Sequence, residues 1–211
     1  LMEFKRLQYK YETWYLVRYH ERIGYGRCCQ TVGLIGYGEI SKEVIRLLKS
    51  FDVEILLHTN YCAKEEADRL GVTLCGLDEL LKTSQIVSLH NTLTEESRGM
   101  IGKRELSLMK DGALFINTAR QPIVDNEAFV AEMRSGRLFG AVDVYQTEPV
   151  ASDYPLLSLP NVICSPHIGG FATKWKSRLA ELIIDNILQF INGEKLTNEV
   201  SVALFDRQSP R

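Results

Sequence analysis

The sequence predicts an α/β fold in which a doubly wound parallel sheet carries helices on both faces. Short apolar runs alternate with stretches of helical periodicity from residue 31 onward, the pattern of strand–helix–strand units. A glycine-rich turn, Gly36-Tyr37-Gly38, follows the first apolar run. In such a sheet ligands bind beyond the carboxyl ends of the strands. The residues that follow each strand are therefore the candidates for chemistry.

The first half of the pattern opens with a buried strand at 31–35 and a helix at 39–50. The helix is predicted from the spacing of Ile40, Val44 and Leu47, which share one face. The elements that follow are a strand at 53–57, a helix at 63–70, a strand at 72–74, a helical turn at 77–82, a strand at 86–89 and a helix at 103–108.

The second half repeats the alternation with a strand at 113–117 and a helix that Asp125 caps, running to Ser135 and stopped by Gly136. Strands at 139–144 and 162–164 follow, and a long helix then spans 173–192. Its apolar stripe, which we expect to pack into the core, is Leu179, Leu182, Ile183, Ile187, Phe190 and Ile191.

Composition excludes several classes of protein. The 211 residues are 45% hydrophobic and 25% charged, which is typical of a globular domain. A net charge of −2 gives no general reason to bind nucleic acid. No apolar run approaches the roughly 18 residues of a membrane span, and the start does not resemble a signal peptide. The five cysteines are odd in number and lack a CxxC spacing, so we expect neither disulfides nor a metal site, and a reducing cytoplasm.

The turn after the first strand has the features of a phosphate-binding loop. Gly36 permits a tight turn, Gly38 lets the backbone approach a pyrophosphate, and Glu39-Ile40 open a helix whose N–H groups face anions. Ser41 stands where Gly or Ala is usual, and it is small enough for close packing. The motif predicts a dinucleotide site, and an ordinary tight turn is the alternative.

The end of the second strand leaves the choice of dinucleotide open. An acidic residue there usually holds the ribose hydroxyls of NAD, but this strand ends in His58-Thr59-Asn60. An arginine that would hold the extra phosphate of NADP is also absent beside it. Thr59 and Asn60 can hydrogen-bond either a ribose or a phosphate. We therefore predict NAD or NADP without a preference.

Three later strands end in residues of complementary chemistry. Arg120 follows one strand, Glu148 the next and His167 the last. A histidine can donate or accept a proton near neutral pH, and a carboxylate beside it orients the ring. An arginine can bind a substrate carboxylate through two hydrogen bonds. These residues are the predicted catalytic set for interconverting a keto acid and a hydroxy acid, and the alternatives are a structural ion pair for Arg120 and a turn for Glu148.

From Thr31 to Val200 the chain resembles the D-isomer-specific 2-hydroxyacid dehydrogenase family. The resemblance rests on the ordered motifs GLIGYGEI, LHNTLTEESRGMIG, MKDGALFINTAR, VDVYQTEP and NVICSPHIGG. It implies a Rossmann-type NAD(P)-binding domain and assigns Arg120, Glu148 and His167 as the catalytic set. The cofactor-binding residues that the loop and the resemblance indicate are Gly36, Gly38, Glu39, Ile40, Thr59, Asn91, Thr92, Thr118, Ala119, Arg120, Asp143, His167, Gly169 and Gly170. Asp143 is expected to face the nicotinamide carboxamide.

The chain departs from the family pattern at a few positions and in its extent. Thr92 stands where proline is common, and Gln121 replaces a glycine and is expected to alter the substrate pocket. Only about 30 residues precede the phosphate loop, so the flavodoxin-like substrate domain is expected to be largely missing and the chain to be a fragment. We expect an aromatic helical linker segment at 1–30, the dinucleotide-binding domain at 31–172 and a C-terminal helix and tail at 173–211.

The leading hypothesis is an NAD(P)-dependent oxidoreductase that transfers a hydride between the nicotinamide and C2 of a small 2-keto or D-2-hydroxy acid. The resemblance also implies a homodimer. The alternative is a non-catalytic dinucleotide-binding module, because the family includes a corepressor branch that binds cofactor as a scaffold. Formate oxidation is disfavoured, because relatives that oxidise formate carry Gln where this chain has Glu148.

Overall fold

The computed structural model describes residues 30–170, 173–197 and 199–205, and the predicted segment at 1–30 lies almost entirely outside them. A seven-stranded sheet has the order β3-β2-β1-β4-β5-β6-β7, and every neighbouring pair is parallel. The strands are β1 (Gln30–Ile35), β2 (Val53–His58), β3 (Thr73–Leu74), β4 (Ile86–Leu89), β5 (Leu114–Asn117), β6 (Phe139–Val142) and β7 (Val162–Cys164). The predicted doubly wound α/β class is confirmed.

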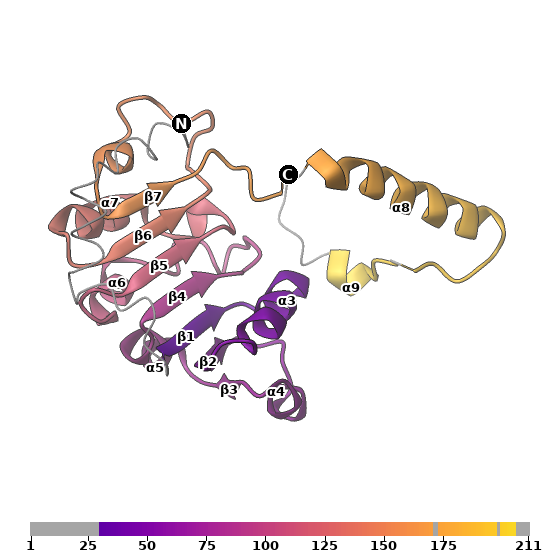
Figure 1. Ribbon diagram of the computed structural model, residues 1–211, viewed down its shortest axis with the longest axis horizontal. Helices are drawn as coiled ribbons and strands as arrows, with labels where there is room; N and C mark the ends of the chain where they lie inside the picture. The colour runs from indigo at the N-terminus through magenta and orange to yellow at the C-terminus, as the bar shows by residue number, and fades with distance from the viewer. Residues whose placement is uncertain (1–29, 171–172, 198, 206–211) are drawn as a thin grey trace.

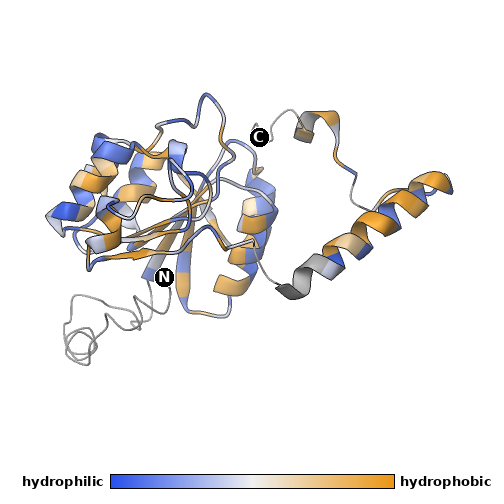
Figure 2. Cartoon of the chain, turned by 90° about the horizontal axis from the view of Figure 1, so that it is seen from above, coloured by the Kyte–Doolittle hydropathy of each residue, from blue (hydrophilic) through white to orange (hydrophobic). Residues whose placement is uncertain are grey.

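Helices cover both faces of this sheet (Figures 1 and 2). They are α3 (Glu39–Leu48), α4 (Lys64–Leu70), α5 (Leu77–Thr83), α6 (Lys103–Leu108) and α7 (Asn126–Ser135), with short 3-10 turns η1 (Gln121–Ile123) and η2 (Pro155–Ser158). The core is correspondingly split. Ile45 of α3 packs with Leu34 and Leu57 in one cluster, whereas Leu80 and Phe115 belong to a larger one. Alternate residues of β1 face opposite clusters, as expected for a strand buried on both sides.

The sheet reverses its strand order between β1 and β4, and this is where a doubly wound fold binds ligands. Gly33 of β1 allows α5 to pack closely there, because a Cβ at this position would lie 2.4 Å from a methyl carbon of Leu80. The chain runs from β1 directly into the glycine turn and then into α3. The predicted strands and helices of the domain are confirmed to within a few residues.

The largest difference concerns α8 (Thr173–Ile191), whose span matches the prediction but whose environment does not. We expected its apolar stripe to be core. In the structure Leu179, Ile183 and Phe190 keep 58%, 52% and 74% of their surface exposed, and α8 with α9 (Val202–Phe205) lies apart from the sheet in Figures 1 and 2. The expectation of core packing is therefore wrong here, because a helical period indicates an apolar face but does not identify what covers it.

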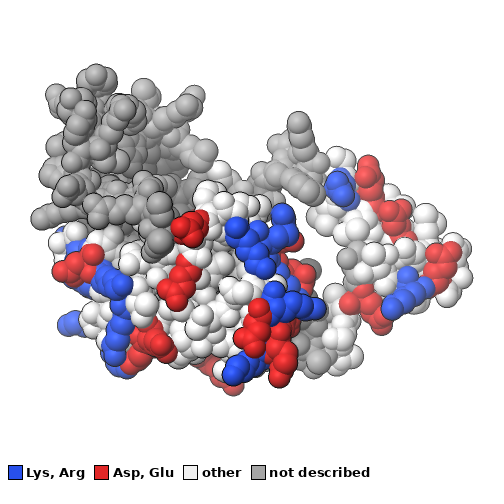
Figure 3. Space-filling model, turned by 60° about the horizontal axis from the view of Figure 1, so that its bottom comes forward, with Lys and Arg blue, Asp and Glu red and all other residues white. Residues whose placement is uncertain are grey.

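Two further features of the described residues are the distribution of charge on the surface and the apolar character of the helices. Acidic and basic side chains are intermixed on the face shown in Figure 3, and α3 carries the ion pairs Lys42–Glu39 and Arg46–Glu43. Neither charge sign dominates that face. Within the described residues, no helix combines the length and apolar character that crossing a membrane requires.

Candidate active site

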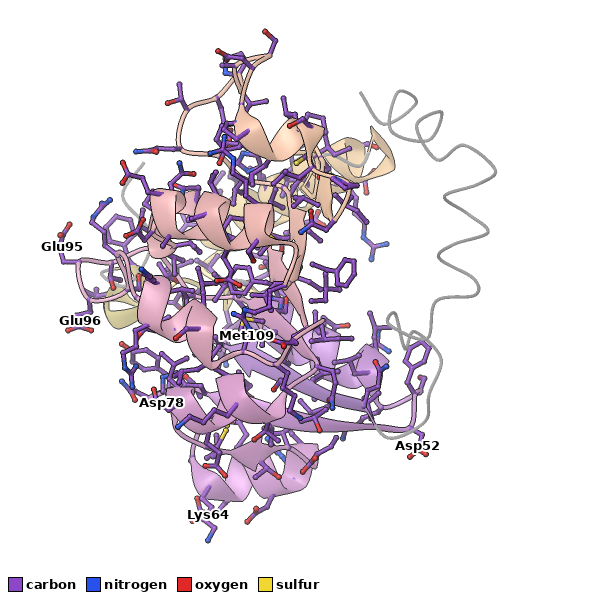
Figure 4. The ribbon with its side chains drawn as sticks, turned by 90° about the vertical axis from the view of Figure 1, so that its left-hand side faces the viewer. Asp52, Lys64, Asp78, Glu95, Glu96 and Met109 are labelled. Carbon is purple, nitrogen blue, oxygen red and sulfur yellow. The ribbon has the colours of Figure 1, made fainter. Side chains whose placement is uncertain are left out.

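A cavity of about 320 Å³ opens at the carboxyl ends of β1, β2 and β4. Figure 4 shows Glu95 and Glu96, in the loop after β4, at the opposite end of the domain from Asp52, which precedes β2. Of the predicted cofactor residues, five line this cavity: Gly36, Gly38, Thr59, Asn91 and Thr92. The size falls in the range of small-molecule and cofactor pockets.

The glycine loop forms one wall of the cavity. Gly36 has φ +99°, a left-handed conformation, and a Cβ there would lie 2.7 Å from the backbone nitrogen of Asn91. Only glycine fits without strain. At Gly38 an added Cβ would meet nothing within 4 Å, so the space before α3 is open. Because Gly38 has no side chain to cap the helix, N–H groups of its first turn remain available to phosphates. This cradle fits a dinucleotide pyrophosphate.

Polar side chains that follow β2 line another part of the cavity. Thr59 Oγ1 accepts a hydrogen bond from the Tyr61 N–H at 3.1 Å. The hydroxyl of Tyr37 donates to Glu66 of α4 at 2.7 Å, and burial together with this carboxylate raises the pKa of Tyr37. The phenol therefore stays protonated and ties the glycine loop to α4.

Two polar atoms at the end of β4 are buried without a partner among the described contacts: Nε2 of His90 and Oδ1 of Asn91. Burial lowers the pKa of His90, so its imidazole is neutral at pH 7. Buried polar atoms are usually hydrogen-bonded, and because His90 and Asn91 both line the cavity, these two atoms are available to a water molecule or a ligand bound there. Asn91 was predicted to bind the cofactor, whereas His90 was not among the predicted site residues. The signal available in the sequence was its place directly after a strand.

The predicted proton-transfer pair is brought together at the other end of the same sheet edge. His167 Nδ1 lies 2.7 Å from Glu148 Oε2, and the Tyr145 N–H donates to Glu148 Oε1 at 3.1 Å. Burial acts to raise the pKa of Glu148, but the hydrogen bonds from His167 and Tyr145 outweigh it and lower the pKa. The carboxylate is therefore ionised near neutral pH, and as an acceptor it favours the tautomer of the neutral ring that carries its proton on Nδ1.

Asp143 directly follows β6 and is only 5% exposed. It accepts hydrogen bonds from the Ser165 hydroxyl, the Ile168 N–H at 3.0 Å and the Gly169 N–H at 2.8 Å. These donors act against burial, which raises the pKa of Asp143, and the net effect is a lowered pKa. The carboxylate that was predicted to face the nicotinamide is thus already bonded to the loop that carries His167.

Arg120 lies at the same sheet edge, after β5, with an exposed side chain. The buried Asn117 shapes its turn by accepting from the Ala119 N–H at 3.0 Å and donating to the Arg120 carbonyl at 3.2 Å. The guanidinium donates to the Ala119 carbonyl at 2.7 Å, and no described contact joins it to His167. Arg120 therefore shares the sheet edge with His167 and Glu148, and no described contact bonds it to either.

Gln121 was expected to alter the substrate pocket. Its side chain is instead buried, with Nε2 3.3 Å from both the Val124 carbonyl and Asn126 Oδ1. It therefore bonds η1 to the start of α7. Its burial gives it a structural role in the turn after β5, and its effect on the substrate pocket stays a prediction.

The remaining predicted cofactor residues lie outside the cavity lining. Ile40 is 71% exposed in the first turn of α3, and the Glu39 side chain pairs with Lys42 at 2.8 Å. Thr118 and Gly170 are exposed beyond β5 and β7. In the described part of the chain, no group of three or more His, Cys, Asp or Glu is placed to hold a metal ion.

A seven-stranded parallel sheet with a glycine turn, a helix amino terminus and a cleft at its switch point defines an α/β dinucleotide-binding domain of the Rossmann type. Comparison with known proteins identifies the family. Residues 2–169 match the family described as D-isomer specific 2-hydroxyacid dehydrogenase, NAD binding domain, and the chain belongs to it.

Individual relatives agree with this assignment. The chain is 37% identical over 180 residues to a glyoxylate reductase of Korarchaeum cryptofilum, covering 85% of this chain and 54% of the relative. The crystal structure of D-mandelate dehydrogenase from Rhodotorula graminis matches with a TM-score of 0.79 at 27% identity, over 94% of this chain and 59% of that one. D-lactate dehydrogenase with NAD+ from Lactobacillus jensenii matches with a TM-score of 0.71 at 27% identity, over 82% and 56%. The chain spans about half the length of the first two curated relatives, 54% and 57%.

Proposed function

We propose that this chain is the nucleotide-binding part of a dehydrogenase that interconverts small 2-keto acids and D-2-hydroxy acids, with NAD or NADP as cofactor. The observation that carries the proposal is the His167–Glu148 pair, 2.7 Å apart, on the sheet edge that also holds the cofactor-sized cavity. The name of the Korarchaeum relative, glyoxylate reductase, supports a small keto acid as substrate.

The roles of the residues follow from their chemistry. The bound nicotinamide supplies or accepts the hydride. His167 donates a proton to the keto oxygen in reduction and removes the hydroxyl proton in oxidation. Glu148 orients the ring and stabilises the imidazolium form. Arg120, exposed at the end of β5, binds the substrate carboxylate through paired hydrogen bonds.

The cofactor contacts are proposed for the predicted residues as a set. The glycine loop and the first turn of α3 bind the pyrophosphate, and Thr59 with Asn91 and Thr92 lines the nucleoside side. Asp143, Thr118, Ala119 and the segment 167–170 lie toward the nicotinamide. The L. jensenii structure, whose description includes NAD+, supports a nicotinamide cofactor.

Assembly and location are further parts of the proposal. Members of the family are commonly dimers through the nucleotide domain, so we propose a homodimer, to be checked by light scattering coupled to size-exclusion chromatography. We also propose a cytoplasmic location, because none of the cysteines that the structure describes, Cys62, Cys75 and Cys164, forms a disulfide.

Turnover tests the proposal directly. Oxidation of NADH and NADPH is followed with glyoxylate, hydroxypyruvate, pyruvate and phosphohydroxypyruvate, using the complete protein that contains this chain. We expect turnover with at least one acid, and a loss of at least about 100-fold in kcat for His167→Asn. The matched control is Asp125→Asn, which removes a carboxylate charge at the N-cap of α7, where asparagine caps about as well as aspartate. Cofactor binding without turnover of any acid by the wild-type protein would contradict the proposal and favour the scaffold alternative.

A further inference from the structure

The catalytic histidine has an unusual backbone. His167 has φ +53°, which makes it the only non-glycine residue with positive φ among those the structure describes. This left-handed conformation is disfavoured for residues with a Cβ and persists only where neighbouring contacts hold it. In this conformation the imidazole Nδ1 lies 2.7 Å from Glu148 Oε2. Contacts from neighbouring groups must therefore fix the backbone on both sides of His167.

The contacts that do so converge on one carboxylate. Asp143 accepts from the Ser165 hydroxyl, two residues before His167, and from the N–H groups of Ile168 and Gly169, directly after it. Its Oδ1 receives two of these donors and its Oδ2 the third. A single buried side chain thus spans the strained position.

A second set of bonds ties the same two loops together. The Tyr145 hydroxyl donates to the Ser165 carbonyl at 2.7 Å, and the Tyr145 N–H holds Glu148 at 3.1 Å. Asp143 and Tyr145 lie two residues apart in one short loop after β6, and both contact the loop that carries His167. The same short loop also carries Glu148, the partner of the imidazole. The positions of Glu148 and of the histidine loop therefore depend on the same short loop.

We propose that Asp143 is a positioning residue for His167: its carboxylate holds the backbone on both sides of the histidine and so keeps the imidazole against Glu148. This role differs from a contact with the nicotinamide, because it operates in the protein without cofactor. Its consequence for turnover rests on the proposed function, but the geometry itself does not.

Asparagine at position 143 is the sharpest probe. All of the described groups around Asp143 donate hydrogen bonds to it, and a carboxylate accepts on both oxygens, whereas an amide presents an NH₂ group on one side. That NH₂ group would face either Gly169 N–H or Ile168 N–H. Asp143→Asn therefore keeps the shape of the side chain and breaks its match to the loop.

The test reads the tautomer of His167 in the cofactor-free protein, by long-range ¹H–¹⁵N NMR of the imidazole at a pH where the ring is neutral. In the wild-type protein we expect the proton on Nδ1, because Glu148 accepts it. In Asp143→Asn we expect the population to move by at least about threefold toward Nε2–H, the form that neutral histidine prefers in water. Ser165→Ala, which keeps both backbone N–H bonds, is expected to lie between the two.

The variants are matched by Asp125→Asn, in which an aspartate that caps α7 loses the same charge away from the loop. It should leave the His167 tautomer unchanged. If Asp143→Asn and Ser165→Ala both keep the wild-type tautomer, the proposal is overturned and Asp143 acts only on bound cofactor. If Asp143→Asn does not fold, the shift in Ser165→Ala decides. Absence of wild-type turnover would contradict the proposed function, but the tautomer measurement would still test the positioning role of Asp143.

Discussion

The two ends of the sheet edge differ in how completely the chain satisfies its own polar groups. After β6 and β7, Glu148 and Asp143 are bonded to His167 and to the loop around it. After β4, His90 and Asn91 bury polar atoms that lack a partner among the described contacts. Under the proposed function, the first end is arranged for chemistry within the chain itself, and the second has polar atoms available to the cofactor. Preorganised groups of the first kind are those that lower a reaction barrier.

The largest effect expected in this comparison is at the preorganised end. Glu148→Gln keeps one acceptor oxygen but removes the charge that stabilises the imidazolium, so we expect kcat to fall by about 10- to 100-fold. Steady-state kinetics with a keto acid and NADH measure it. The thermal midpoint should change little, because the Glu148 side chain is 38% exposed. Unchanged kcat would show that the pair does not move the proton.

Two glycine substitutions distinguish the requirement for a left-handed backbone at Gly36 from the requirement for open space at Gly38. Gly36→Ala should weaken NADH binding and also lower the stability by about 1–3 kcal/mol, because the position has φ +99° and its Cβ would lie 2.7 Å from backbone. Gly38→Ala should weaken binding alone, since its φ is −146° and its Cβ meets only open space. Fluorescence titration and thermal unfolding compare the two. Equal binding by Gly38→Ala and wild type would show that no ligand uses this space.

The stability of the preorganised end should depend on pH through Asp143. Its pKa is lowered in the folded protein, since the donors outweigh burial. Its stabilisation is therefore fully present above about pH 4, the ordinary range of an aspartate, and is lost as the pH falls through the folded pKa. We expect Asp143→Asn to cost about 1–3 kcal/mol at pH 7. The difference from wild type should shrink in urea unfolding curves below about pH 4, and a constant difference down to pH 2 would contradict this.

The smallest effect is expected after β4, where a substitution should raise the stability of the cofactor-free protein instead of lowering it. Asn91→Leu removes a buried oxygen without a described partner, so the cofactor-free protein should gain up to about 1 kcal/mol of stability. The same change should weaken NADH binding by about tenfold, because the site loses a polar contact. Unfolding in urea with and without NADH measures both. A loss of stability without cofactor would mean that Asn91 is already satisfied within the chain.

Sequence periodicity accounted for most of the fold. The alternation of strands and helices, the cap at Asp125 and the left-handed Gly136 follow from local patterns and were confirmed. The exposure of α8 could not be predicted this way, because an apolar stripe such as that of Leu179 and Phe190 indicates only that some surface covers it. What covers a helix is a tertiary property.

The candidate site likewise contains residues that the sequence predicts and contacts that depend on the tertiary structure. Glu148 and His167 are predictable because each follows a strand and their chemistry is complementary, and the structure brings them together. The bonds of Asp143 to Ser165 and Gly169 join residues more than 20 positions apart, so they depend on how β6 and β7 pair. The buried Nε2 of His90 likewise exists only once the sheet and its loops have assembled.

Amide hydrogen exchange with and without NADH tests the contrast between the two ends most directly. We expect the N–H groups of Ile168 and Gly169 to be protected from exchange already in the cofactor-free protein, because Asp143 accepts a hydrogen bond from each. Protection in the glycine loop and at Asn91 should rise only when NADH is added. The opposite result, with 168–169 exchanging freely until NADH binds, would show that the cofactor rather than the chain arranges the catalytic end.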